Sequence, residues 1–255
     1  MAIVKTEKEI KVLAEGGKRL AEILRKVADA AQAGVTTKEL DALAERLILF
    51  SGGTPSFKGY NAFGARSAYP ASLCTSINDE VVHGIPSEKR VLKEGDIIGL
   101  DIGMKYSGLY TDTAITVGVG AIDADSKKLM DVTRAALAAG ILQVRAGGYT
   151  GDIGEAVQAY VEDYGFGIVR ELVGHGVGHK VHEEPEIPNF GKRGHGVLLK
   201  EGMVLAIEPM VTAGSFRLHL DEDEWTWRTQ DGTRAAHFEH TIVVTKNSAR
   251  VLTEI

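Results

Sequence analysis

The tetrapeptide LKEG occurs twice in the chain, at residues 92–95 and at residues 199–202. Six residues after its glycine, each copy is followed by a carboxylic acid, Asp101 in the first case and Glu208 in the second. A turn and strand repeated with an acid at the same offset indicate two halves of one fold that share a site. Carboxylates that converge in this way are suited to binding metal ions.

The pattern of helices repeats together with the tetrapeptide. Apolar residues spaced by three and four predict two helices in each half, over residues 10–27, about 36–51, 129–139 and 150 to about 164. Thr36, with Glu39 three residues later, predicts a capping box at the start of the second helix. We therefore interpret residues 1–255 as a single domain made of two related halves, about 1–120 and 121–255.

The composition excludes several classes of protein. The 255 residues are 44% hydrophobic and 25% charged, as in ordinary globular domains, and the net charge of −6 accompanies no basic cluster for nucleic acid. The N-terminus lacks the apolar segment of a signal peptide, and no run reaches the roughly 18 apolar residues of a membrane span. We expect a cytoplasmic protein that binds neither nucleic acid nor membrane. Because Cys74 is the only cysteine, an intrachain disulfide and a cysteine-based zinc site are excluded.

Asp101 and Asp112 lie among the strand-like pieces and turns that we predict over residues 54–120. If the chain turns at Tyr106-Ser107, the two aspartates are direct partners across a hairpin and point to one face. Like charges about 5 Å apart destabilise a sheet unless a cation lies between them. One aspartate could instead belong to the turn, as aspartate often does, but both lie far from its centre. The segment therefore favours two metal ligands.

Three histidines, His175, His179 and His182, lie within eight residues of a glycine-rich segment. Three glycines in five residues disfavour a helix, so we predict a strand over about 168–182. In a strand His175 and His179 share a face, while His182 points the other way unless the chain bends. A single histidine is more often structural than a metal ligand, but three together favour at least one ligand. The chain contains no HExxH sequence, so a helical zincin site is excluded.

Glu208 and Glu239 each lie beside an apolar run. Glu208 follows a strand-like segment and precedes Pro209, and Glu239 precedes the final predicted strand, residues 241–244. An ionised glutamate in apolar surroundings costs about several kcal/mol unless it is paired. The partner is a metal ion or an arginine in a buried salt bridge. We favour the metal, because four such acids compete for few nearby cations.

The candidate ligands are four carboxylates and one imidazole, from Asp101, Asp112, His175, Glu208 and Glu239. Such ligands suit divalent cobalt, manganese, iron or zinc, and four negative charges indicate two divalent metal ions rather than one. Two ions about 3.5–4 Å apart can hold a bridging hydroxide and polarise a carbonyl group. The residues therefore predict hydrolysis of an amide or an ester.

The motifs around these residues resemble those of type I methionine aminopeptidases, which are pita-bread metallopeptidases. In family order they are VHGIP at 82–86, the paired aspartates, GHG at 174–176, HEEP at 182–185, IEPM at 207–210 and FEHT at 238–241. The resemblance implies an α/β (α+β) catalytic domain with the pita-bread fold. In that fold, two halves related by a pseudo-twofold axis place a central antiparallel sheet, flanked by helices, around a dinuclear metal site. The implied activity is removal of the initiator methionine when the second residue is small.

The same resemblance assigns roles to the candidate ligands. Asp101 and Asp112 resemble the chelating aspartates, and Asp112 with Glu239 would bridge the two ions. His175 and Glu208 would complete the ligands of the other ion. The implied reaction is attack by a bridging water or hydroxide on the scissile carbonyl.

Three residues are implied to take part in catalysis. Glu208 would be the general base for the attacking water. His182 resembles the residue that donates a hydrogen bond to the carbonyl oxygen as it gains charge. His83 resembles the histidine that contacts the scissile amide on the leaving side, although without the resemblance its sequence favours an ordinary loop histidine before Gly-Ile-Pro.

The resemblance also implies a pocket for the methionine side chain. The matching positions are Tyr60, Tyr69, Cys74 and Trp225, with Phe57 and Val181 at positions that vary within the family. Each could equally be a plain core residue. The family has a short Gly-Tyr-x-Gly-Tyr-Pro stretch before the cysteine, whereas residues 61–68 separate the two tyrosines here. This insertion could change the depth of the pocket or its tolerance for the second residue.

Two other functions are compatible with this fold. Proline-specific aminopeptidases and creatinase-like hydrolases generally carry an additional N-terminal domain, whereas only about 80 residues precede His83 here. A binding module without catalysis would lack ligands, and all five are present. We expect the partners to be the N-termini of nascent peptides that begin with methionine and a small residue, with the ribosome as a candidate partner. We expect the protein to be a monomer.

Overall fold

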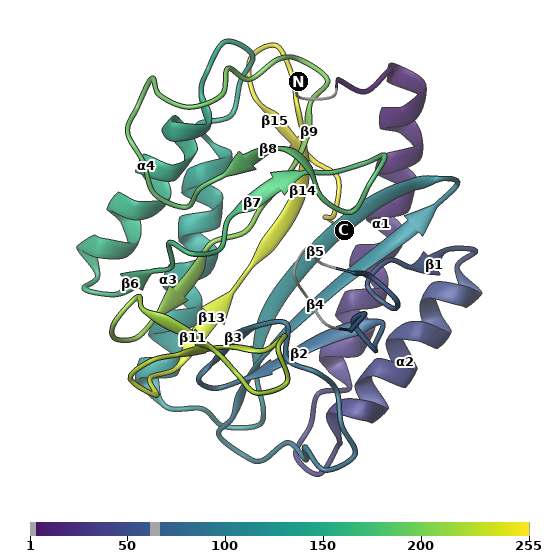
Figure 1. The fold of residues 1–255 in the computed structure, drawn as a ribbon, viewed down its shortest axis with the longest axis vertical. Coiled ribbons are helices and arrows are strands. Elements are labelled where there is room, and N and C mark those ends of the chain that lie inside the picture. The colour runs from purple at the N-terminus through teal and green to yellow at the C-terminus, as the bar shows by residue number, and fades with distance from the viewer. Residues whose placement is uncertain (1–3, 62–66, 255) are drawn as a thin grey trace.

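The structure is a computed structural model that describes residues 4–61 and 67–254. In these ranges the helices are α1 (Glu7–Asp29), α2 (Thr37–Phe50), α3 (Ala124–Ile141) and α4 (Thr150–Asp163) (Figure 1). The four helices predicted from the sequence are confirmed, with ends that differ by a few residues. None of the helices in the described ranges is long and apolar enough to cross a membrane.

Capping boxes define the starts of α1 and α2. The Oγ1 atom of Thr6 accepts the N–H of Glu9 at 3.3 Å, and the Glu9 carboxylate accepts the N–H of Thr6 at 2.7 Å. Thr36 and Glu39 form the same pair of hydrogen bonds, 3.1 Å and 2.8 Å long. Each box satisfies two backbone groups at a helix start that have no partner within the helix. The predicted capping box at Thr36 is therefore confirmed.

A large antiparallel sheet lies at the centre of the fold. Its strands are β1 (Thr54–Pro55), β2 (Leu73–Ile77), β4 (Ile97–Tyr106), β5 (Leu109–Gly118), β7 (Gly174–Gly176), β8 (Glu183–Ile187), β9 (Val204–Ile207), β14 (Glu239–Val244) and β15 (Ala249–Val251). Their order is β1-β4-β5-β14-β9-β7-β8, with β2 paired to β4 and β15 paired to β14. Strands that are distant in the chain, such as β5 and β14, are therefore neighbours in the sheet.

Two small antiparallel sheets complete the fold. They contain β3 (Glu80–Val82), β6 (Gly167–Ile168), β10 (Met210–Thr212), β11 (Leu218–Leu220), β12 (Trp227–Thr229) and β13 (Ala235–His237). One sheet has the order β13-β10-β6 and the other β11-β12-β3. The second pairs residues of the C-terminal half with β3, which lies directly before His83.

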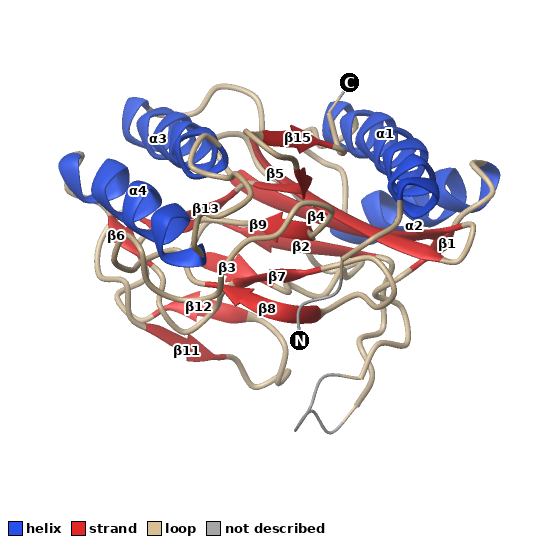
Figure 2. Ribbon diagram, turned by 90° about the horizontal axis from the view of Figure 1, so that it is seen from above, coloured by secondary structure: helices blue, strands red, loops and turns tan. Residues whose placement is uncertain are grey.

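The helices cover one face of the large sheet in two pairs, α1 with α2 and α3 with α4 (Figure 2). Ile98, Leu100 and Ile102 of β4 are fully buried in the cluster that includes the apolar side chains of α1 and α2. Because side chains alternate along a strand, Asp101 points to the opposite face. The face without helices is therefore available for polar groups.

The two LKEG segments form equivalent turns. Gly95 and Gly202 have φ values of 88° and 84°, a conformation that favours glycine. β4 and β9 each begin two residues after this glycine, so Asp101 and Glu208 occupy matching positions relative to the two turns. Each turn is held by a backbone hydrogen bond of 2.9 Å, from Gly34 to Leu92 and from Gly147 to Leu199.

β4 and β5 form a hairpin whose register differs from the predicted one. The turn residues are Ser107-Gly108, with φ values of 47° and 90°, instead of Tyr106-Ser107. Two positive φ values match the twist of the flanking strands, and glycine adopts one of them without steric cost. Asp101 consequently pairs with Ala114, so the prediction that it pairs directly with Asp112 is wrong. The shift of two residues keeps both aspartates on one face, as diagonal neighbours.

Two further strand predictions are wrong in part. The predicted strand over 168–182 is divided between β6, β7 and a loop of residues 177–182. Gly178 in this loop has a φ of 139°, and a Cβ atom there would lie 2.3 Å from Cε of Lys5, so the chain bends around that side chain. The predicted final strand, 241–244, is the larger part of β14, and β15 follows it.

Threonine hydroxyls join β5 to β14 at the centre of the sheet. Thr113 Oγ1 donates to the carbonyl oxygen of Glu239 at 2.8 Å. Thr241 Oγ1 donates to the carbonyl oxygen of Asp112 at 2.7 Å and accepts its N–H at 3.0 Å. Buried hydrogen bonds of this kind satisfy the backbone and fix the pairing of the strands. They hold Asp112 and Glu239 on adjacent strands.

A buried ion pair attaches the N-terminal segment to Glu183, the first residue of β8, which directly follows the loop of residues 177–182. Lys5 Nζ lies 2.5 Å from Glu183 Oε2, and the two side chains are 0% and 2% exposed. The other oxygen of Glu183 accepts the N–H groups of His179 and Lys180, at 2.5 Å and 2.8 Å. A half-exposed pair, Glu9 with His179, adds a second contact of 2.5 Å. The carboxylate of Glu183 thus has a charged partner and two backbone donors.

Replacing Lys5 by methionine is expected to destabilise the fold by about 3–5 kcal/mol, because the carboxylate of Glu183 would remain buried without its cation. Methionine keeps most of the length of the side chain. Denaturant unfolding followed by circular dichroism measures the change. Lys58→Met is the matched control, since Lys58 pairs with Glu45 at the surface, with exposures of 50% and 30%, and its loss is expected to cost only about 0–1 kcal/mol. Equal losses for the two variants would contradict the prediction.

Candidate metal centre

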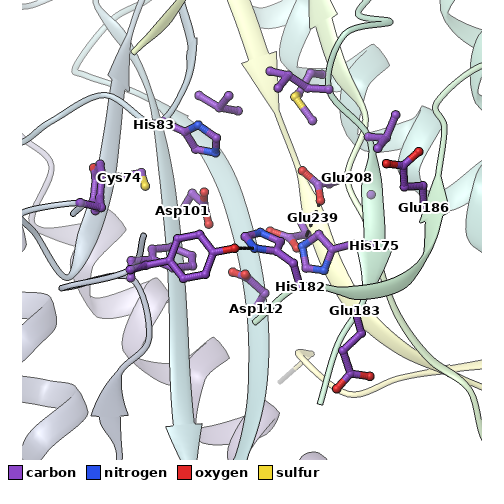
Figure 3. A pocket seen from close by; sticks show the side chains of 18 of the residues that line it. Cys74, His83, Asp101, Asp112, His175, His182, Glu183, Glu186, Glu208 and Glu239 are labelled. Carbon is purple, nitrogen blue, oxygen red and sulfur yellow. Dashed lines mark hydrogen bonds and ion pairs between the residues drawn. The ribbon is translucent and has the colours of Figure 1, made fainter. Parts of the chain in front are cut away.

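The five candidate ligands converge on the face of the large sheet that has no helices (Figure 3). Four of them lie on different strands and Glu208 directly follows a fifth, and the five strands are adjacent in the sheet. In order across the sheet they are Asp101 of β4, Asp112 of β5, Glu239 of β14, Glu208 directly after β9, and His175 of β7. The fold therefore brings together all the ligands predicted from the sequence.

The distances within this cluster fit a metal ion. One ligand atom from each of Asp112, His175 and Glu239 lies within 4.8 Å of the other two. The Nε2 atom of His175 lies 3.4 Å from Oε1 of Glu208. One carboxylate oxygen each of Asp101, Asp112 and Glu239 is buried without a hydrogen-bond partner among the described residues. Because buried polar atoms are normally paired, these converging oxygens fit a cation as their partner.

Burial raises the pKa of all four carboxyl groups. It raises the pKa of Asp101 to about 7. The pKa values of Asp112, Glu208 and Glu239 are also raised well above the ordinary range, first by burial and then by the charges of neighbouring carboxylates. In the described ranges neither glutamate pairs with an arginine or a lysine, so the alternative of a buried salt bridge to arginine is not supported. Keeping this cluster ionised at neutral pH requires added positive charge.

The histidines of the glycine-rich segment have different surroundings. His175 and His182 line one cavity, with ring centroids 4.3 Å apart. Burial lowers the pKa of His175 to about 3, so its ring is neutral, which is the form that binds metals. The prediction that His175 and His179 share a face is wrong, because Nε2 of His179 contacts Glu9 at 2.5 Å outside the cluster. The bend in residues 177–182 turns His182 toward the ligands instead.

His83 lies in the same cavity, although its sequence is also typical of an ordinary loop residue. Its ring centroid is 6.4 Å from that of Trp225. The φ of His83 is 60°, a conformation that is unfavourable for a residue with a Cβ and that occurs often at functional sites. Desolvation lowers the pKa of His83 to about 4, so its ring is neutral at pH 7.

The predicted pocket residues form the apolar side of this cavity, whose volume is about 690 Å³. The volume lies in the usual range for sites that bind small ligands, about 300–1,000 Å³. Among the described residues, the lining includes the five candidate metal ligands together with Phe57, Tyr60, Tyr69, Cys74 and Trp225. Val181 packs in the same cluster but does not line the cavity. The apolar side chains are therefore the wall of a cavity next to the ligands as well as a packed cluster.

The insertion at residues 61–68 begins and ends at the pocket wall. Tyr69 donates its N–H to the carbonyl oxygen of Tyr60 at 2.8 Å, and Gly59 donates to the carbonyl oxygen of Tyr69 at 2.8 Å. These two bonds bring the tyrosines together across the inserted residues. Residues 62–66, and with them the predicted effect on pocket depth, lie outside the described residues.

His237 and Lys5 are among the residues near the site that the predictions did not include. His237 is 2% exposed, and its Nε2 lies 3.7 Å from Oε2 of Glu208. Its position two residues before Glu239 was an available signal, because such residues share a face of an extended chain. Lys5 gave no such signal, since its partner Glu183 lies 178 residues away.

The sequence profile of metallopeptidase family M24 matches residues 11–246 of the chain. The chain belongs to metallopeptidase family M24. Methionine aminopeptidase 1 of Bacillus subtilis is 47% identical over 255 residues, with 100% of each chain covered. The crystal structure of methionine aminopeptidase from Thermotoga maritima has 44% identity, a TM-score of 0.96 and complete coverage of both chains. Membership of the M24 family makes this chain a metallopeptidase, and its carboxylate cluster is suited to a divalent metal.

The M24 comparison also confirms the predicted pita-bread fold and the resemblance from which it was inferred. Prolidase from Pyrococcus furiosus shares the fold with a TM-score of 0.74 at 22% identity. That match covers 100% of this M24 chain but 66% of the prolidase. At 22% identity the comparison shows a shared fold and gives no information about a shared substrate.

Proposed function

We propose that this M24 chain is a methionine aminopeptidase that removes the initiator methionine when the second residue is small. The observation that carries the proposal is the shared cavity, in which five metal ligands lie on one side and an aromatic pocket on the other. A substrate whose side chain fills the pocket would present its first peptide bond to the metal ligands. The similar proteins of Bacillus subtilis and Thermotoga maritima, both methionine aminopeptidases, support this assignment.

We also propose that residues 1–255 form one catalytic domain with two pseudo-twofold halves, about 1–120 and 121–255. The matching turns at Gly95 and Gly202 support this division. Strands β5 and β14, which come from different halves, are adjacent in the sheet and carry Asp112 and Glu239. Neither half alone contains the complete set of ligands.

The ligand set fits two divalent ions, of cobalt, manganese, iron(II) or zinc. Asp101 and Asp112 would hold one ion and His175 with Glu208 the other, while Asp112 and Glu239 would contact both. When bound, these ions would lower the pKa of a water molecule and polarise the carbonyl group of the substrate. The oxygens of Asp101, Asp112 and Glu239 that have no hydrogen-bond partner within residues 4–61 and 67–254 support this arrangement.

Three side chains would carry out the remaining chemistry. Glu208 would accept the proton of the attacking water, because its oxygens lie at the edge of the cluster, 3.4 Å from His175 Nε2 and 3.7 Å from His237 Nε2. His182 would donate a hydrogen bond to the carbonyl oxygen as negative charge develops on it. His83 would contact the amide nitrogen on the leaving side.

The pocket residues would bind the methionine side chain. Tyr60, Tyr69, Cys74 and Trp225 line the cavity beside the ligands, and Phe57 extends this wall. A thioether is flexible and makes favourable contacts with aromatic rings, so it suits this lining. The substrates would be the N-termini of nascent chains, and we place the enzyme in the cytoplasm as a monomer that meets them at the ribosome.

A panel of three peptides tests the substrate assignment. The enzyme loaded with manganese is expected to release methionine from a Met-Ala peptide at least about 10-fold faster than from a matched Met-Leu peptide, because a larger second residue must fit beside the catalytic groups. A matched Ala-Pro peptide is expected to be cleaved least. Values of kcat/KM, obtained by chromatography of the released amino acid, give the comparison. Preference for the Ala-Pro peptide would overturn the assignment in favour of a proline-specific peptidase.

A further inference from the structure

Tyr60 forms a hydrogen bond with the proposed oxyanion donor. Its Oη atom lies 2.7 Å from Nδ1 of His182. The two rings meet edge to face, with centroids 5.1 Å apart. Tyr69, the other tyrosine of the pocket, directs its hydroxyl to the backbone carbonyl groups of Gly84 and Leu73 instead. The two tyrosines of the pocket wall therefore use their hydroxyl groups differently.

The bond to Nδ1 constrains which atom of His182 can act on a substrate. A neutral imidazole has one N–H donor and one acceptor nitrogen. If Tyr60 donates its O–H to Nδ1, the proton of the ring must be on Nε2. The Nε2–H group is then free to donate to a carbonyl oxygen, as oxyanion stabilisation requires. In the opposite arrangement, Nδ1–H donates to Tyr60, and Nε2 becomes an acceptor that would repel the developing charge.

We propose that Tyr60 is a positioning residue that donates to Nδ1 of His182 and thereby keeps the N–H of His182 on Nε2, directed into the cavity. This inference rests on the proposed function, because it concerns the residue that stabilises the carbonyl oxygen. It adds a second role to Tyr60. The ring forms part of the methionine pocket, while the hydroxyl acts on the catalytic histidine.

Both partners of this hydrogen bond are held in place by the backbone around them. The N–H of Tyr60 donates to the carbonyl oxygen of Phe57 at 2.8 Å, and its carbonyl oxygen accepts the N–H of Tyr69 at 2.8 Å. His182 is adjacent to Glu183, which is bound to Lys5 and to two backbone N–H groups of the same loop. The Oη–Nδ1 bond therefore joins two segments that are each hydrogen-bonded to their surroundings.

This arrangement links recognition of the side chain to catalysis. A methionine side chain in the pocket would pack against the ring of Tyr60 and limit its movement, and thereby also limit the movement of the hydroxyl. A substrate that leaves the pocket empty would bind next to a less restrained His182. Selectivity for the first residue would then be expressed in kcat as well as in KM.

The Tyr60→Phe variant separates the two roles, because it keeps the ring and removes only the hydroxyl. On a Met-Ala peptide we expect kcat to fall on the order of 10- to 100-fold, as when the partner that orients a functional histidine is lost, while KM stays within about twofold. In a His182→Ala background, the same change is expected to leave kcat unaltered, because the two residues act as one unit. Tyr106→Phe, outside the cavity, serves as the matched control. Thermal unfolding of each variant checks that the fold is retained.

Nitrogen-15 NMR of histidine-labelled, zinc-loaded protein provides a measurement that does not depend on activity. The resonances of His182 are assigned by their loss in His182→Ala. We expect the wild-type protein to show the Nε2–H tautomer and the Tyr60→Phe variant to show a mixture. Any of three results would overturn the proposal. The first is a wild-type His182 ring protonated on Nδ1, and the second is an unchanged kcat for Tyr60→Phe. The third is a double variant whose loss of kcat equals the product of the losses in the two single variants. Absence of methionine release by the wild-type enzyme would instead overturn the proposed function, and the tautomer would still report on the hydrogen bond.

Discussion

Protein stripped of metal is expected to release no methionine from a Met-Ala peptide, and activity is expected to return when manganese, cobalt or iron(II) is added. The physical reason is the concentration of four carboxyl groups in one buried cluster, three of which have an oxygen without a hydrogen-bond partner among the described residues. Without cations the cluster can neither remain fully ionised nor activate water at neutral pH. Dialysis against a chelator, followed by a titration of methionine release against added metal, measures the effect.

The metal-free protein also allows a test of whether the carboxyl groups of the cluster are the metal ligands. Its metal affinity is expected to fall as the pH is lowered from about 8 to about 6, because protons compete for carboxyl groups such as that of Asp101, whose pKa is raised to about 7. An aspartate of the unfolded chain titrates near about 3.9. Protonation of Asp101 therefore stabilises the folded state relative to the unfolded chain. This stabilisation is complete below about pH 4 and is lost as the pH rises through 7. Added metal should raise the melting temperature more at pH 8 than at pH 6.

Two outcomes would contradict this account of the metal centre. Full cleavage of the peptide after chelation, with metal content verified as negligible, would show that catalysis does not require a metal ion. Stronger metal binding at low pH would show that the carboxyl groups of the cluster are not the ligands.

Asp112→Asn, which neutralises the ligand proposed to contact both ions, is expected to behave like the stripped protein at metal concentrations that saturate the wild type.

Glu208→Gln is expected to lower kcat by a factor on the order of 10² to 10⁴, which is the usual contribution of a general base. Glutamine keeps the length of the side chain and one oxygen that can bind a metal, but it cannot accept the proton of the attacking water. The cost should therefore appear mainly in kcat. Steady-state kinetics at saturating metal, together with metal content measured on the same sample, separates lost catalysis from lost metal.

Glu201→Gln is the matched control for this substitution. Glu201 belongs to the second LKEG turn, seven residues before Glu208, and its side chain is exposed. Its loss is expected to leave kcat within about twofold, as for most surface substitutions. Turnover by Glu208→Gln that equals the control would assign proton transfer to another group of the cavity.

Much of the fold could be predicted from local sequence. The helices follow from apolar spacing and from capping residues such as Thr36 and Glu39, because a helix is stabilised by contacts three and four residues apart. The LKEG repeat predicted equivalent turns, because the positive φ of Gly95 and Gly202 depends mainly on the turn itself. Where the prediction failed, as in the hairpin of Asp101 and Asp112, the error was a choice between two turn positions that differ by one residue.

The candidate ligands could also be selected from the sequence, because paired acids and clustered histidines next to apolar runs are costly unless they bind something. The surroundings of those residues could not. His179 and His182 are three residues apart in the same loop, yet one contacts Glu9 at the surface and the other contacts Tyr60 in the cavity. Gly178, directly before His179, packs against the side chain of Lys5, a contact that no local pattern predicts.

By itself the sequence determined the helices, the two equivalent turns and the types of candidate metal ligand in this M24 chain, since each depends on residues close together in the chain. Only the tertiary structure decided the order of strands β4-β5-β14-β9-β7, which brings Asp101, Asp112, Glu239, Glu208 and His175 to one site. It also decided the contact between Tyr60 and His182, which are 122 residues apart. Strand pairing and side-chain contacts at such separations depend on how the whole chain buries its apolar surface, so no local pattern records them.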